Sequence, residues 1–387
     1  MITSSLLFAT ATSYQAGAAD YDTPAGETVY VDEPITGSQG VFKFGEGTLV
    51  LKAYNIYTGL TWITGGTVRL SGNTAGIVNA GSDTLVRNST LTIEGAYLET
   101  DILWIEGDEK TGLVEVNNGS VEVREYLSVG DEANGRMVVT GSSSVAVERL
   151  YVGFDAGVEG ELVISGSQAT LYAADEVEVA YDGNGLLRIE NGASATFDGS
   201  FHIGYSEGVS GTVQDGAQVN ATNFQISNGG SAYVVIDGQG TRLEAGNFEM
   251  GTQEGGDFVT LVISNGASFH VTGNSDIGSG NYASISVGNS VWQNDGTLSL
   301  NKTGLYLSEG GRLETNGLVQ FGSYNYVLIS GEGSLWHHKQ GTFLANGSNI
   351  STIILENGGT LQIDEDGIPG GGGIRYDNEL AIIIGID

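Results

Sequence analysis

Acidic residues recur at one position of a repeating sequence unit, and stacked carboxylates are groups that can bind hard cations. They follow the third strand expected in each unit, at Asp108, Asp131, Asp155, Asp182, Glu207 and Glu254. Like charges on neighbouring strands repel, and Ca²⁺ takes carboxylate oxygens as ligands, so a calcium ion held by Asp131, Asp155 and Asp182 is one interpretation. Because the spacing is irregular and the calcium-binding G-G-x-G-x-D nonapeptide does not occur, we favour a solvated acidic rim.

A second acidic segment, DEDG at residues 364–367, resembles the start of a calcium loop through Asp364 and Asp366. The bidentate glutamate expected downstream is not there. Polysaccharide cleavage would need paired carboxylates, but among 47 acidic residues some pair lies close by coincidence. We therefore predict no catalytic residue, no cofactor and no metal beyond these calcium candidates.

The chain has four histidines, so few positions could support histidine-based catalysis or metal binding. His202 and His270 lie at strand positions beside apolar residues and are expected on the surface or with a partner in the sheet. His337 and His338 belong to SLWHHKQG, which departs from the repeat and which we interpret as an inserted loop. No zinc spacing, phosphate-binding loop or G-x-S-x-G elbow occurs.

Composition excludes several classes of function. The 387 residues include 14 basic and 47 acidic side chains, for a formal net charge of −33, which argues against binding nucleic acid or an anionic membrane surface. The absence of cysteine rules out disulfides and thiol chemistry. No run approaches the ~20 apolar residues of a spanning helix, so we expect no membrane insertion.

The elements that would position these side chains repeat with a period of about 24 residues. One marker is a ladder of turn glycines: Gly95, Gly119, Gly141, Gly166, Gly192, Gly216, Gly238 and Gly266. The other is a ladder of strand ends: Ile105, Val129, Val152, Val179, Ile203, Ile226, Met250 and Ile277. Such a period predicts an all-β, single-stranded β-solenoid, of the right-handed parallel β-helix kind, with about 12 to 14 coils spaced by roughly 4.8 Å.

Alternation within each unit assigns the inward side chains, since successive residues of a strand point to opposite faces. The inward residues of the first strand are Val114, Val116, Met137, Val139, Leu162, Ile164, Leu187 and Ile189. Those of the second strand are Val121, Val123, Val145, Val147, Ala169, Leu171, Ala195 and Phe197. Glu115, Val138, Val163 and Arg188 should face outward. No unit can bury its apolar face alone, so stacking makes the core.

The segment 45–72, GEGTLVLKAYNIYTGLTWITGGTVRLSG, carries the most distinctive motif. It resembles the autotransporter-associated β-strand repeat of bacterial secreted passenger domains. The later units are similar to repeats of type V secretion passengers and of exported surface proteins that bear a sorting tag. The matching positions are Gly47, Thr48, Leu49, Leu51, Asn55, Tyr57, Thr58, Gly59, Thr61, Ile63, Gly66, Thr67 and Leu70. The resemblance extends to about residue 290 and implies a secreted, repeat-built passenger.

Three regions follow from these patterns. Residues 1–40 are expected to be an arm and N-terminal cap, residues 41–367 the solenoid, and residues 368–387 a glycine-rich hinge with a C-terminal strand. An unpaired apolar strand is an aggregation hazard, so this strand should either cap its own solenoid or add to a neighbouring chain. Its assembly candidates are Leu380, Ile382, Ile383, Ile384 and Ile386.

Together these features favour a non-catalytic extracellular protein of the bacterial cell surface. The first hypothesis is a structural scaffold or filament subunit that forms homo-oligomers through its termini. The second is a passenger-like adhesin that acts as a monomeric stalk and contacts surface glycans or neighbouring cells. The third is a β-helix protein that binds or degrades polysaccharide.

Overall fold

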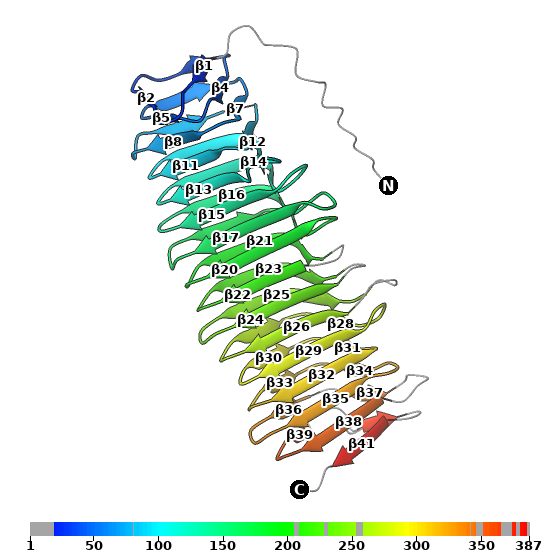
Figure 1. Ribbon diagram of the computed structural model, residues 1–387. Helices are drawn as coiled ribbons and strands as arrows, with labels where there is room; N and C mark the ends of the chain where they lie inside the picture. The colour runs from blue at the N-terminus through cyan, green and yellow to red at the C-terminus, as the bar shows by residue number, and fades with distance from the viewer. Residues whose placement is uncertain are drawn as a thin grey trace.

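The computed structural model describes residues 19–79, 81–204, 209–227, 231–252, 258–340, 342–345, 351–364, 374–376 and 380–384. All regular elements among them are strands, arranged in a 16-stranded and a 25-stranded sheet, here called sheet B and sheet A. The turns stack into an elongated rod, with the first strands at one end and β41 at the other (Figure 1). The predicted all-β solenoid is therefore confirmed.

Each turn contributes one strand to sheet B. Its strands are β2 (Thr28–Val31), β5 (Thr48–Leu51), β8 (Thr67–Ser71), β11 (Thr90–Glu94), β13 (Gly112–Asn117), β15 (Gly135–Thr140), β17 (Glu159–Ser165), β20 (Asn184–Glu190), β22 (Val209–Gln214), β24 (Ala232–Asp237), β26 (Val259–Ser264), β29 (Ala283–Gly288), β32 (Thr303–Ser308), β35 (Tyr326–Ser330), β38 (Ser351–Glu356) and β41 (Leu380–Ile384). Fourteen of these 16 strands lie between residues 41 and 367, which confirms the 12 to 14 coils expected there, and β2 and β41 extend the sheet at its two ends.

Sheet A contains two files of strands, which each turn visits in order. The first file is β3 (Thr36–Gly37), β6 (Tyr54–Tyr57), β9 (Gly76–Val78), β18 (Thr170–Ala173), β27 (Ser268–Val271), β30 (Val291–Asn294), β33 (Arg312–Thr315), β36 (Leu335–His338) and β39 (Thr360–Ile363). The second file is β1 (Ala19–Asp22), β4 (Val41–Phe44), β7 (Thr61–Ile63), β10 (Thr84–Arg87), β19 (Glu176–Val179), β28 (Ser275–Ile277), β31 (Leu298–Leu300), β34 (Val319–Phe321), β37 (Phe343–Ala345) and β40 (Ile374–Tyr376). Six long strands span both files: β12 (Tyr97–Glu106), β14 (Ser120–Val129), β16 (Ser144–Val152), β21 (Ser194–Ile203), β23 (Gln218–Ile226) and β25 (Arg242–Met250).

All strand pairs are parallel, and their register keeps one side-chain position above the next. In sheet B, Val114 pairs with Met137, Met137 with Leu162, and Leu162 with Leu187. These residues are 0–2% exposed, as are most members of both predicted inward sets. The apolar files are therefore the interior of the molecule, as the alternation predicts. Val163 faces outward as expected but is only 5% exposed.

The turn glycines, and the glycines that follow several strand ends, mark corners where the backbone must reverse sharply. Gly130, Gly153 and Gly204 end the second file with φ of 75°, 69° and 90°, a region that only glycine enters without strain. Between sheet B and the first file, Asn191 and Gly192 both have positive φ, which Asn-Gly pairs favour. The repeat period therefore reflects the need for residues with a left-handed backbone conformation at the same corners of successive turns.

Asn55, in the motif that resembles a known repeat, holds three turns together. This side chain is fully buried. Its Oδ1 accepts a hydrogen bond from the Ile35 amide at 2.9 Å, and its Nδ2 donates to the Gly76 carbonyl at 2.9 Å. A buried amide is stable only when its hydrogen bonds are made, which explains why Asn stands among apolar residues here.

The predicted N-terminal cap is itself a turn of the solenoid. From residue 19 onward, β1 pairs with β4, β2 with β5 and β3 with β6. At this end the buried Lys43 ammonium donates to three carbonyl oxygens, those of Phe44, Gly45 and Gly65, at 2.6–3.0 Å. At the other end β41 pairs with β38 of the same chain, so the C-terminal strand continues its own solenoid.

Candidate functional site

The predicted acidic rim forms where the second file of sheet A ends. Asp131, Asp155 and Asp182 lie in corner loops after β14, β16 and β19, on consecutive turns. The loops are stacked, because the Phe154 amide donates to the Gly130 carbonyl at 2.8 Å and the Asp182 amide to the Phe154 carbonyl at 2.9 Å. The structure therefore brings the three carboxylates into one row.

Electrostatics in this row are dominated by negative charge. Burial raises the pKa of Asp131 to about 6, and the carboxylates of Asp155 and Glu132 add to the shift. Burial also raises the pKa of Asp155, with a further contribution from Asp182. Among the described residues, no positive side chain contributes to the shift of either pKa.

The acidic residues considered as calcium ligands do not form a preformed metal site in the described part of the chain. Among the residues that the structure describes, no group of three or more His, Asp or Glu side chains is placed to hold a metal ion. Asp364 instead accepts a hydrogen bond from Gln362 Nε2 at 2.8 Å, and its Oδ2 lies 2.6 Å from His337 Nε2. Both contacts lower its pKa. Asp366 lies outside the described residues.

The interpretation of SLWHHKQG as an inserted loop is wrong. Leu335–His338 form β36, which pairs in register with β33 and β39. Trp336 is fully buried, and its Nε1 donates to Thr315 Oγ1 at 3.1 Å, while His338 Nδ1 lies 2.9 Å from the same hydroxyl. The repeat looks interrupted because Asn294, Thr315 and His338 occupy one inward file. Buried polar side chains replace apolar ones there: Thr315 and His338 bond to each other, and Asn294 bonds to the buried Ser275.

The other histidines lie in the sheet, as expected. His270 Nε2 lies 2.8 Å from Asp295 Oδ2 on the neighbouring turn. His202, on β21, is aligned with Glu178 on β19, and burial lowers the pKa of this histidine.

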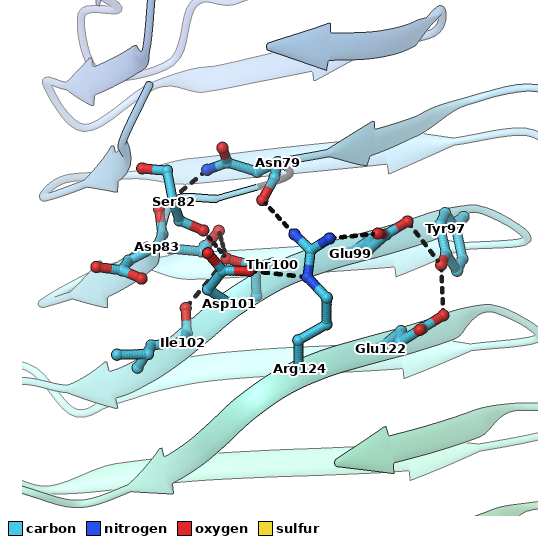
Figure 2. Close-up of polar contacts among 11 residues, drawn as sticks. Asn79, Ser82, Asp83, Tyr97, Glu99, Thr100, Asp101, Ile102, Glu122 and Arg124 are labelled. Carbon is cyan, nitrogen blue, oxygen red and sulfur yellow. Dashed lines mark hydrogen bonds and ion pairs between the residues drawn. The ribbon is translucent and has the colours of Figure 1, made fainter. Parts of the chain in front are cut away.

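Arg124 forms an ionic cluster that the sequence did not reveal (Figure 2). Its Nε donates to Asp101 Oδ1 at 2.8 Å, its Nη1 to Glu99 Oε1 at 3.0 Å, and its Nη2 to the Asn79 carbonyl at 3.0 Å. Tyr97 extends the network through its hydroxyl, as Figure 2 shows. Since the guanidinium binds both carboxylates, this cluster is suited to clamping turns together and not to moving protons.

Glu176 and Glu178 form a carboxyl pair with features of an acid–base centre. Glu178 is aligned with Tyr151 and His202 in the second file. Burial, and then the neighbouring Glu176, raise the pKa of Glu178 to about 7. Tyr151 donates its hydroxyl to Glu176 Oε2 at 3.2 Å. A protonated carboxyl beside a carboxylate could transfer a proton, but catalysis also needs a cleft that holds the substrate.

Two hollows in the described part of the chain lie away from this pair. A void of about 10 Å³ lies inside the core between residues that include Leu187, Phe201 and Gly211. A shallow depression of about 410 Å³ lies on sheet B beside Arg136 and Glu161. Neither is lined by Glu176 or Glu178.

The two ends of the rod are the remaining candidate site. Val29 and Leu49 are aligned in one inward file, but Val29, in the first turn, is 36% exposed whereas Leu49 is 0% exposed. Tyr30, Tyr54 and Ile56 near this end are also exposed. The other end is formed by β41, whose residues 380–384 align with residues 351–355 of β38; Ile386 lies outside the described residues.

Searches against protein-family models, curated proteins and solved structures found no match. In the described part of the chain, no helix has the length and apolarity that crossing a membrane requires.

Proposed function

We propose that the protein is a non-catalytic, extracellular structural protein of the bacterial cell surface, which assembles into a filament or scaffold through its terminal strands. The observation that carries this proposal is the incomplete burial of the first turn. Leu49 is shielded from solvent in its inward file, whereas Val29, the next residue of that file toward the end of the rod, is partly exposed. A second copy stacked on this end would complete the file.

Strand direction supports a head-to-tail contact. All strands are parallel, so β41 at one end and β2 at the other present complementary edges of the same sheet. Unpaired edges template the addition of another strand. A contact between two different surfaces of one chain repeats without closing when its rotation does not form a ring, and a filament results.

The extracellular location is proposed from composition together with the repeat resemblance. A formal charge of −33 keeps a long, edge-exposing rod soluble. These features also suit the monomeric stalk, which makes self-association the property to measure.

Electron microscopy and light scattering of the purified full chain test the proposal. We expect regular fibres whose formation is lost in Val29→Glu, since a charge in the exposed file would be buried at the junction. Deletion of Asn378–Asp387 should have the same effect. The matched control is Tyr306→Glu, because Tyr306 is similarly exposed, at 37%, but lies on β32, which is paired on both sides with β29 and β35.

Two results would contradict a filament. Wild-type protein that remains a single rod at every concentration would favour the monomeric stalk. Fibres that form equally well in Val29→Glu would place the contact elsewhere than at the end of the rod.

A further inference from the structure

A row of aromatic rings follows the second file of sheet A on its outer face. It consists of Trp104, Tyr126, Tyr151, Phe154 and Tyr181, here called the aromatic row. Neighbouring ring centroids are 5.8, 5.9, 5.1 and 4.9 Å apart in that order. Each ring is partly exposed. The row therefore presents a continuous aromatic surface parallel to the rod axis.

Carboxylates surround the aromatic row. The charges of Asp131, Asp83 and Glu125 act on Tyr126, whose pKa is raised to about 12 mainly by burial. Burial also raises the pKa of Tyr151 to about 12, with a contribution from Glu176. The exposed Asp155 and Asp182 lie in the same corner loops as Phe154 and Tyr181. A ligand on this surface would thus meet aromatic faces and negative charge together.

One side chain of the protein shows which chemical group this environment accepts. Arg149 on β16 is aligned with Tyr126 on β14, and its guanidinium carbon lies 5.8 Å from the centroid of the Tyr126 ring. Guanidinium groups stack on aromatic faces and bind carboxylates in two-pronged fashion, whereas ammonium groups do neither as well.

We propose that the aromatic row, with Asp131, Asp155 and Asp182 beside it, is a binding surface for an extended, arginine-rich polypeptide segment. Rings and carboxylates recur on consecutive turns, about 4.8 Å apart, so a linear chain of cations fits along the axis better than a compact ligand. This inference goes beyond the proposed assembly and does not depend on it, because the aromatic row lies on the flank and not at an end of the rod.

Calorimetric titration of the full chain with oligo-arginine and oligo-lysine peptides of equal length tests the proposal. We expect the arginine peptide to bind about tenfold more tightly, since stacking on aromatic faces adds on the order of 1 kcal/mol. Tyr151→Leu should remove most of that preference. Asp155→Asn combined with Asp182→Asn should weaken binding without disturbing the fold, because both side chains are exposed.

Matched controls separate this surface from the general negative charge. Tyr306→Leu removes one ring of an aromatic pair on sheet B, and Glu309→Gln combined with Glu332→Gln removes two exposed charges far from the row. Neither should change binding. Equal affinity for both peptides, or equal losses in the control variants, would overturn the proposal, and so would tighter binding of glucosamine oligomers than of the arginine peptide.

Discussion

Gly211 occupies an inward position of sheet B where the neighbouring turns have Leu187 and Val234. The small core void lies beside it. A Cβ at this position would lie 2.6 Å from Cδ1 of Ile203, the end of a flexible side chain that can move aside, so Gly211→Ala should fill space and restrict the unfolded chain. We expect stability to rise by about 1 kcal/mol, measured as an increased denaturant midpoint. Gly153→Ala is the opposite control, because its Cβ would lie 2.3 Å from the Asn184 carbonyl oxygen. A lowered midpoint in Gly211→Ala would show that the file cannot accept a side chain there.

Glu178 should make stability depend on pH. It is only 7% exposed, and its pKa in the folded protein is about 7, above the ordinary value of 4.5. The folded state therefore holds this proton more tightly than the unfolded state. The protonated Glu178 side chain therefore contributes its full stabilisation below about pH 4.5, and this contribution is lost as the pH rises through about 7. Glu178→Gln should be more stable than wild type at pH 8 by on the order of 2 kcal/mol, with a smaller difference at pH 4.

Denaturant titrations at the two pH values measure that difference. Glu148→Gln, at an exposed position one turn away, is the control and should change stability little at either pH. A Glu178→Gln variant that is equally destabilised at both pH values would show that packing, and not ionisation, governs this position.

At the scale of single strands and corners, hydroxyl side chains couple each turn to the next. Thr241 Oγ1 accepts a hydrogen bond from the Gly216 amide at 2.9 Å and donates to the Asp237 carbonyl at 2.6 Å. The same contact to a turn amide recurs, with Ser143 bonded to Gly119, Ser290 to Gly266 and Ser334 to Gly310. The corners are thus cross-linked along the rod by side chains as well as by sheets.

Thr241→Val keeps the shape of this side chain but removes both hydrogen bonds. Because the Gly216 amide would lose its partner, we expect the free energy of unfolding to fall by about 1–3 kcal/mol. Thr241→Ser keeps the hydroxyl and should retain most of the wild-type stability. The denaturant midpoints of the two variants provide the measurement. Equal losses in both would mean that the methyl group and not the hydroxyl matters.

The sequence predicts the strands and the core well because both depend on a local period. Alternation alone places Val114, Met137, Leu162 and Leu187 in one file, and the glycine ladder places the corners. The hydroxyl contacts could also have been found, since each hydroxyl follows a turn glycine by two or three residues, as Ser143 follows Gly141.

Other features depend on contacts that no local period encodes. Arg124 lies at a register shift in β14 and reaches the carbonyl of Asn79, 45 residues earlier in the chain. The residues around Arg124 give no sequence signal for this register shift. The inward polar file of Asn294, Thr315 and His338 likewise makes sense only once the turns are stacked. For the acidic rim, the sequence places the carboxylates in a row but not the aromatic rings beside them, which come from both a strand and a corner loop.

At the scale of the whole molecule, each turn contacts chiefly its neighbours, so a complete turn should be removable. Deleting residues 135–159 would join Asn134 to Gly160, and Gly160 is aligned with Gly135 in sheet B. The inward file would then run from Val114 directly to Leu162. The variant should fold into a rod shorter by about 4.8 Å, with a similar circular dichroism spectrum and cooperative unfolding. X-ray scattering would measure the shortening.

The control deletion removes residues 135–146, about half a turn. After this deletion, a residue from the first file of sheet A occupies a position that belongs to sheet B. Both the side-chain alternation and the corner glycines are then out of phase with the neighbouring turns. Since register is set by the buried face, this variant should lose cooperative unfolding and aggregate. If instead the complete-turn deletion fails to fold while the half-turn deletion folds, the turns are not interchangeable layers, and the end-to-end addition of another copy would lose its physical basis as well.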